Sequence, residues 1–305
     1  MATGLEKRAC PITGNQSAQS YKTIIDHYTG DEYQVVKCPE TQFLYLDPAP
    51  DLEHIAEHYA NHAGQNMTTK PPTLFNFFRR FAFQSECHTL LNNLKPNSKI
   101  IDLGTGDGQL ARFFKESQLQ AKGMDFFPES EWPHDDIPYS SINLNETSVL
   151  ETLDTNAIVM RHVLEHVHYP LEMIKAFHTA NIDYVMVVVP NVESPAVNWF
   201  GTDWCSWDPP RHLQFFSEKT LRELFQRAGY REIGKHDHGI DEIVVSFFRK
   251  KMIQWHQDPE SRTCERPEEE SWYPLLESKN SLCTLAAVLQ GPFLPSVLSR
   301  TFQRV

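Results

Sequence analysis

The stretch KIIDLGTGDG, residues 99–108, decides the fold. An apolar strand over Lys99–Leu103 runs directly into three glycines at alternate positions, and a helical pattern begins at Gln109. Glycines at such a turn let the backbone bend tightly and approach a ligand closely. The first turn of the helix offers N–H groups to polar or anionic parts of that ligand. The stretch therefore predicts a strand, a ligand-binding glycine loop and a helix.

The spacing of these glycines separates the loop from two common phosphate-binding loops. In the dinucleotide-binding pattern G-x-G-x-x-G the third glycine comes one residue later than it does here. A P-loop has a Lys-Ser or Lys-Thr pair after its glycines, and none follows Gly108. The acid of this motif also precedes the glycines, at Asp102. An NAD-dependent oxidoreductase is therefore disfavoured.

Polar residues end the next two predicted strands as well. Asp125 closes the second strand, where a carboxylate can accept hydrogen bonds from a ribose diol. Asn143 closes the third, where a side-chain amide could read an adenine edge. A helix cap at Asp125 and an Asx turn at Asn143 are the structural alternatives. Together with the glycine loop, these positions predict a nucleoside-shaped ligand.

Outward from this loop, apolar strands alternate with helical patterns. The clearest buried strand is Asp183–Val189, and Ser217–Ala228 is a helix that Ser217 caps and Gly229 ends. This alternation predicts βαβ units and a mostly parallel sheet. Two final strands, 230–236 and 242–250, have no long crossover between them and predict an antiparallel pair at one edge.

The segments outside this core have a different character. Residues 1–74 form a β-rich arm plus a helix, in which Cys10-Pro-Ile-Thr13 and Cys38-Pro-Glu-Thr41 repeat a pattern. The arrangement resembles a zinc ribbon in which threonine replaces the second cysteine of each knuckle, so we interpret it as a ribbon without its metal. A chance repetition is the alternative. Residues 75–250 form the core, and 251–305 predict a linker and a helical C-terminal extension.

Composition limits the partners. The 305 residues carry 28 Lys and Arg against 40 Asp and Glu, a net charge of −12, which disfavours binding to nucleic acid. No apolar run suggests a membrane span or a secretory signal, and the six scattered cysteines suit reduced thiols. We expect a cytoplasmic protein with a small-molecule substrate, which forms a homodimer if its arm or tail supplies an interface.

At this point the sequence resembles class I S-adenosylmethionine-dependent methyltransferases, in the subgroup with a ubiquinone-O-methyltransferase-like core. The matching pieces follow the family's order: IIDLGTGDG (100–108), GMD (123–125), NAIVMRHVLEHVHYP (156–170), VMVVVPN (185–191) and PPRHLQFFSEKTLRELFQRAGY (209–230). The usual Leu-Lys-Pro-Gly-Gly turn before the fifth strand is missing, which is a structural departure. The resemblance implies an α/β, Rossmann-like sheet of seven mostly parallel strands flanked by helices, with the β-rich arm and a helical tail attached.

The resemblance also implies a site for S-adenosylmethionine, with S-adenosylhomocysteine as product. Asp102 and the Gly104–Gly108 backbone would hold its amino-acid part, and Asp125 its ribose. The full set of implied cofactor residues is Asp102, Gly104, Thr105, Gly106, Gly108, Asp125, Phe126, Asn143, Leu144, Met160, Arg161 and Tyr59.

Methyl transfer requires alignment of the nucleophile and, where needed, a general base. The candidate bases are His212, His166 and His162, whereas Glu165 is expected to brace the start of a helix. His162-x-x-Glu165-His166 also has a spacing that holds metals on helices. Because it follows a strand here, we predict no metal.

A second cluster follows the fifth strand. Trp199, Trp204 and Trp207 lie on a loop with Pro and Gly and predict an aromatic wall over the substrate, although buried packing is the alternative for any one of them. Arg211 is the candidate partner for an anionic substrate group. The leading hypothesis is O-methylation of a small molecule. The alternatives are C-methylation of a sugar nucleotide or polyketide-type intermediate, and a cofactor-binding regulator or scaffold without activity.

Overall fold

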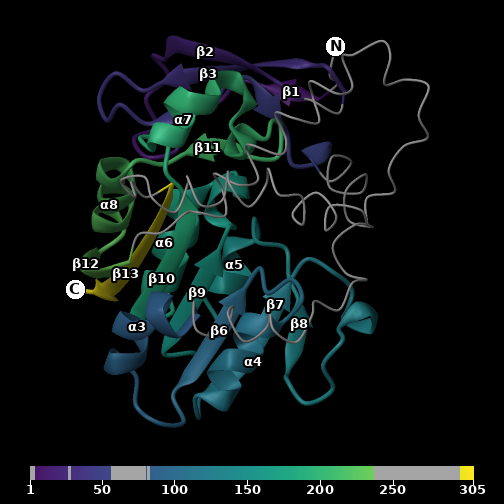
Figure 1. Cartoon of the computed structure of the whole chain (residues 1–305), viewed down its shortest axis with the longest axis vertical. Helices are drawn as coiled ribbons and strands as arrows, with labels where there is room; N and C mark the ends of the chain where they lie inside the picture. The colour runs from purple at the N-terminus through teal and green to yellow at the C-terminus, as the bar shows by residue number, and fades with distance from the viewer. Residues whose placement is uncertain (1–3, 27–28, 56–79, 81–82, 237–295) are drawn as a thin grey trace, which may run out of the picture.

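The computed structural model describes residues 4–26, 29–55, 80, 83–236 and 296–305 (Figure 1). Its centre is a seven-stranded sheet. In spatial order the strands are β12 (Tyr230–Lys235), β13 (Val297–Arg304), β10 (Tyr184–Pro190), β9 (Ala157–Arg161), β6 (Lys99–Leu103), β7 (Gln120–Asp125) and β8 (Tyr139–Ser141). The five strands from β10 to β8 are parallel, and β13 is antiparallel to both of its neighbours. The expected Rossmann-like α/β fold is confirmed.

Helices cover both faces of this sheet. In the described part of the chain these are α3 (His88–Asn93), α4 (Gln109–Glu116), α5 (Thr147–Leu150), α6 (Pro170–Thr179) and α8 (Glu218–Arg227). Helix α7 (Pro195–Phe200) instead packs in a separate buried cluster with residues of the N-terminal arm. The short 3-10 turns are η2 (Glu129–Glu131), η3 (Leu164–His166), η4 (Gly201–Asp203) and η5 (Cys205–Trp207). Apolar side chains of α3 and α4 share one buried cluster with alternate strand residues, and those of α5, α6 and α8 share another with the remaining ones. The strands are thus buried on both sides, as apolar runs without polar alternation predict. No helix in the described residues combines the length and apolarity that a membrane crossing requires.

Residues 297–304 correct one prediction. We expected a helical extension, but Val297–Arg304 is strand β13, which inserts between β10 and β12 (Figure 1). Its apolar residues alternate between the two faces: Val297 joins one buried cluster, and Leu298 and Phe302 join the other. Strand formation here depends on pairing with β10, more than a hundred residues earlier, and local sequence does not report such a partner. The antiparallel edge pair therefore joins β12 to β13, and the expected strand 242–250 lies outside the described residues.

The arm forms a small sheet of its own beside the end of the central sheet (Figure 1). Strands β2 (Gln19–Ile25), β3 (Glu32–Lys37) and β4 (Leu44–Leu46) run antiparallel, and β1 (Leu5–Glu6) pairs separately with β5 (Ala49–Pro50). The fourth strand of the arm sheet is β11 (Gln214–Phe215), which comes from the core. The arm sheet is therefore completed by residues far beyond the predicted boundary at 74.

The two Cys-Pro fragments of the arm fold alike. The N–H of Cys10 donates to the carbonyl of Asn15, and the N–H of Gly14 donates back to Cys10. In the same way, the N–H of Cys38 donates to the carbonyl of Phe43, and the N–H of Gln42 donates back to Cys38. Gln42 thus takes the position of Gly14, and both have a left-handed backbone. Both thiols are buried and free. The repeated sequence pattern is thus a repeated turn.

Arg8 ties the arm to the core. Its guanidinium donates to the carbonyl oxygens of His168 at 2.8 Å and Leu213 at 3.2 Å. Its backbone N–H donates to the carboxylate of Asp47 at 2.9 Å. Hydrogen bonds from a charged donor are stronger than neutral ones. The arm is therefore fixed to the two core segments that follow β9 and precede α8.

Candidate active site

The glycine loop, residues 104–108, lies at the carboxyl end of β6 as expected. Gly104, Gly106 and Gly108 all have positive φ, at 76°, 53° and 73°. A Cβ on Gly104 would come within 2.2 Å of Val163 Cγ2, whereas a Cβ on Gly106 would meet nothing within 4 Å. Gly104 is thus required by backbone and space together. The open space beside Gly106, next to the first turn of α4, is where the backbone can approach a ligand.

Two buried carboxylates flank this loop. Asp102 accepts a hydrogen bond from Thr105 Oγ1 at 2.7 Å, and burial raises its pKa to about 7. Asp125 accepts from the backbone N–H groups of Gly106 at 2.9 Å and Phe126 at 2.8 Å. Burial also raises the pKa of Asp125. Each oxygen of Asp125 accepts one of these two bonds and has the capacity to accept another, so this carboxylate fits the ribose role.

Three other expected cofactor residues, Phe126, Leu144 and Asn143, lie in different surroundings. Phe126 projects into solvent beside Phe127, with ring centroids 4.2 Å apart, and Leu144 packs against the core. Asn143 accepts from the N–H of Asn145 and donates to Glu146, which is the Asx-turn alternative. An Asn143 engaged in its own turn is poorly placed to read a base.

The residues that end β9 differ from one another. The Met160 side chain is fully buried in the core, so only its backbone is available to a ligand. Arg161 forms an ion pair with buried Glu86 at 3.0 Å and lies over the Phe83 ring. His162 has positive φ and a side chain about one third exposed. Tyr59 lies outside the described residues.

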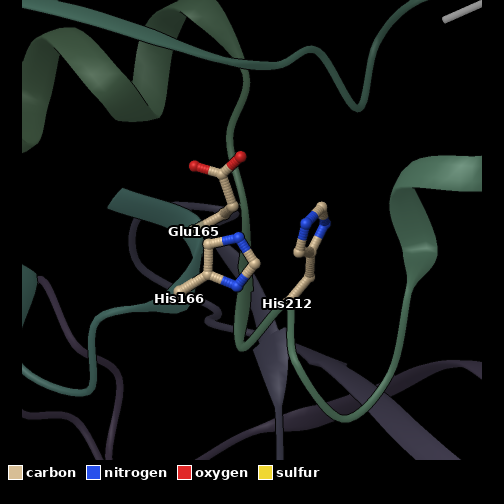
Figure 2. Close-up of side chains that lie close together, drawn as sticks. All are labelled: Glu165, His166 and His212. Atoms are coloured by element: carbon tan, nitrogen blue, oxygen red, sulfur yellow. The ribbon is translucent and has the colours of Figure 1, made fainter. Parts of the chain in front are cut away.

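Beyond β9, two segments bring three polar side chains together, which we call the histidine cluster: Glu165, His166 and His212 (Figure 2). One ligand atom of each lies within 4.8 Å of the others, and the two imidazole centroids are 4.6 Å apart. The segments are joined by backbone bonds, since Leu213 N–H donates to Glu165 O. The Gln214 side chain also donates to Leu164 O and Val167 O. Both histidines are predicted from the sequence as candidate bases, but nothing in their spacing indicates that they meet.

The electrostatics of the cluster centre on Glu165, whose side chain is 1% exposed. Desolvation works to raise its pKa, but the surrounding histidines outweigh it and hold the pKa below its usual value. His162 Nδ1 lies 3.4 Å from its Oε1. Desolvation and the nearby His212 lower the pKa of His166 to about 4. Glu165 is therefore ionised and His166 neutral near pH 7. The helix-bracing role that we expect for Glu165 from the sequence does not include this buried negative charge beside a neutral imidazole.

The prediction of an aromatic wall over the substrate is wrong for two of the three tryptophans. Trp204 and Trp207 are 1% exposed and pack edge to face in the cluster of side chains between the arm sheet and α7. They are buried because the arm sheet covers this loop, and the sequence does not reveal that cover. Trp199 remains largely exposed on α7.

Arg211, the expected partner for an anionic substrate group, already forms an ion pair within the protein. Arg211 Nη2 lies 2.7 Å from Asp208 Oδ2, and the same carboxylate oxygen is 3.9 Å from His212 Nε2. Asp208 was not among the predicted site residues, although it stands four positions before His212. Its carboxylate therefore faces both a cation and a candidate base.

Comparison with known proteins gives one family. The family described as a methyltransferase domain matches residues 75–233. No curated protein matches the chain.

Several solved structures have a similar arrangement. The 1,6-didemethyltoxoflavin-N1-methyltransferase of Burkholderia thailandensis is 12% identical, with a TM-score of 0.49 and coverage of 92% of this chain and 99% of that one. A SAM-dependent methyltransferase from Archaeoglobus fulgidus is 13% identical, with a TM-score of 0.48 and coverage of 76% and 100%. Magnesium protoporphyrin IX methyltransferase from Synechocystis is 11% identical, with a TM-score of 0.46 and coverage of 61% and 93%. Likenesses at this level say nothing about the acceptor.

Proposed function

The chain belongs to the methyltransferase-domain family, is a methyltransferase and uses S-adenosylmethionine, and we propose that it methylates an oxygen atom of a small-molecule acceptor. The observation that carries the proposal is a glycine loop with two buried carboxylates after β6 and β7, and a pair of histidines brought together after the neighbouring strand β9. The strongly acidic composition, with a net charge of −12, argues against a nucleic-acid acceptor. Because the overall charge is negative, an anionic group of a small-molecule acceptor would have to be bound by individual basic side chains at the site.

The residues at the glycine loop fit the cofactor. The carboxylate of Asp125 suits a ribose diol, and ionised Asp102 suits an ammonium group. The open space at Gly106 admits a ligand against the backbone. When bound, S-adenosylmethionine supplies an electrophilic methyl group.

The chain's own contribution to the chemistry is alignment and proton removal. We assign the base role to His212. Its Nδ1–H donates to the carbonyl of Ser206 at 2.8 Å, so Nε2 carries the lone pair that accepts the acceptor's hydroxyl proton. Asp208, at 3.9 Å from Nε2, would stabilise the imidazolium that forms. His166 is a weaker candidate because of its lowered pKa, and His162 remains the third.

The other segments receive coarser proposals. We assign residues 75–250 to the catalytic core, 1–74 to a metal-free zinc-ribbon-like arm, and 251–305 to an extension whose end supplies β13 to the core sheet. The matching turns at Cys10 and Cys38 support the ribbon interpretation. A cytoplasmic location and a homodimer through arm or tail remain proposals, as does membership of the ubiquinone-O-methyltransferase-like subgroup.

Calorimetry with S-adenosylhomocysteine, followed by transfer of isotope-labelled methyl groups to a panel of phenols, acids and sugars, tests the function. We expect binding that Asp125→Ala weakens by about tenfold or more, as loss of charge-assisted hydrogen bonds implies. Asp154→Ala, at an exposed carboxylate far from the loop, is the control. Absence of binding by the wild-type protein contradicts the cofactor site. Labelling of carbon or nitrogen alone contradicts the oxygen acceptor.

A further inference from the structure

We propose that the histidine cluster, Glu165, His166 and His212, is a binding site for a divalent transition-metal ion such as Zn²⁺. The proposal rests on the geometry of these side chains and is independent of the methyl acceptor. From the sequence we predict no metal, because His162-x-x-Glu165-His166 follows a strand. The structure supplies a different third residue, His212, from a distant segment (Figure 2).

The separations suit a metal. One carboxylate oxygen and one nitrogen from each ring lie within 4.8 Å of one another. Nitrogen and oxygen ligands sit about 2.0–2.2 Å from zinc, so a tetrahedral ion holds them roughly 3.4 Å apart. Side-chain rotations that move these atoms by about an ångström would close the set around an ion.

Both imidazoles are oriented as metal ligands are. His166 Nδ1 lies 3.0 Å from Arg211 O, and His212 Nδ1 lies 2.8 Å from Ser206 O. A carbonyl oxygen can only accept, so each Nδ1 carries the proton and each Nε2 the lone pair. Metal-binding histidines characteristically donate their other ring N–H to a carbonyl or carboxylate, which fixes the tautomer and the direction of the ring. Two neighbouring rings with this arrangement point to one bound cation.

Glu165 supplies an independent observation. Its side chain is 1% exposed, and within the described part of the chain neither carboxylate oxygen has a hydrogen-bond partner. A buried carboxylate without hydrogen bonds is costly unless a cation compensates it. His162 Nδ1, 3.4 Å from Oε1, is the alternative source of that compensation. A metal ion beside Glu165 would compensate the buried carboxylate directly.

The ligand types also select the ion. Two imidazole nitrogens and one carboxylate suit Zn²⁺ or Co²⁺, whereas Mg²⁺ and Ca²⁺ prefer oxygen ligands. Three protein ligands are typical of zinc sites that leave a position for water or substrate. His212 Nε2 cannot bind an ion and accept a proton together. The base role assigned to His212 therefore applies to metal-free protein, and metal occupancy would abolish it.

The test uses the full-length protein without a purification tag, stripped with a chelator. Titration with Co²⁺, followed by visible absorption, and with Zn²⁺, followed by calorimetry, should show one ion per chain. Glu165→Gln and His212→Gln should each weaken binding at least about 100-fold, because loss of even an outer partner costs 10–100-fold. Circular dichroism must show that each variant is folded, and Mg²⁺ should not compete.

Two controls make the result decisive. His88→Gln changes an exposed histidine on α3 and should bind Co²⁺ like the wild type. His162→Gln removes an outer partner of Glu165 and should weaken binding less than loss of either ligand does. If wild-type protein binds no Co²⁺, or if folded His212→Gln binds it unchanged, the proposal is wrong. Methyl transfer is measured separately on metal-free protein, so failure of either proposal leaves the other intact.

Discussion

The glycine loop and the histidine cluster follow two adjacent strands, β6 and β9, yet they are encoded in opposite ways. The loop is one contiguous stretch whose three left-handed glycines stand within five residues. The cluster joins a turn after β9 to a loop before α8, and Arg8 of the arm binds carbonyl oxygens on both segments. The loop is therefore specified locally, whereas the cluster depends on how distant segments pack. Perturbing the two regions separately should have separable effects.

The largest effect is expected at His212. In metal-free protein, His212→Gln should lower kcat by roughly 10²–10⁴-fold, the usual contribution of a general base, and leave S-adenosylhomocysteine affinity unchanged. Single-turnover kinetics with the acceptor found in the panel measure the loss, with His88→Gln as control. A kcat within a few-fold of the wild-type value would remove His212 from the base role.

The next effect tests the loop itself. Gly104→Ala should cost about 3 kcal/mol of unfolding free energy, because it combines a left-handed backbone with overlap on the rigid Val163 side chain. Gly106→Ala has the same kind of backbone and open space, so it should cost only about 1 kcal/mol. Urea denaturation compares the pair. Equal losses would show that backbone strain, and not space, fixes Gly104.

Arg8→Ala should affect the histidine cluster and leave the glycine loop unchanged. Loss of its bonds to His168 O and Leu213 O should cost about 2 kcal/mol, since hydrogen bonds from charged donors contribute 1.5–3 kcal/mol each and water can replace part of that. Co²⁺ affinity should fall, while S-adenosylhomocysteine affinity stays the same. Lys7→Ala, at an exposed neighbour, is the control. If cofactor affinity falls as much as Co²⁺ affinity, the regions are not independent.

The smallest effect concerns pH at the loop. Because burial raises the pKa of Asp102 to about 7, its carboxyl is largely neutral below that pH and cannot pair with an ammonium group. Affinity for S-adenosylhomocysteine should therefore fall by about tenfold from pH 8 to pH 6. Calorimetry across this range measures the slope, and Asp102→Asn should flatten it. An unchanged slope in the variant would assign the titration to another group.

The success of the sequence predictions follows the same division. The strand over 99–103, the helix from Gln109 and the cap at Ser217 were predicted because hydrophobic period and capping chemistry are local. The burial of Trp204 and Trp207 was missed because the arm sheet covers them. Strand β13 was missed because its partners lie far away in sequence. Aromatic and β-branched residues suit several environments, and only the packing chooses among them.

By itself the sequence determined the parallel core and the loop geometry at Gly104, Gly106 and Gly108, since both follow from short-range sterics and alternation. It also determined that Asp102 and Asp125 end neighbouring strands beside that loop. Only the tertiary structure decided that Glu165 would be buried, that His212 would stand beside His166, and that residues 297–304 would complete the sheet. Those outcomes depend on contacts between segments tens of residues apart or more, where desolvation and backbone pairing are settled jointly.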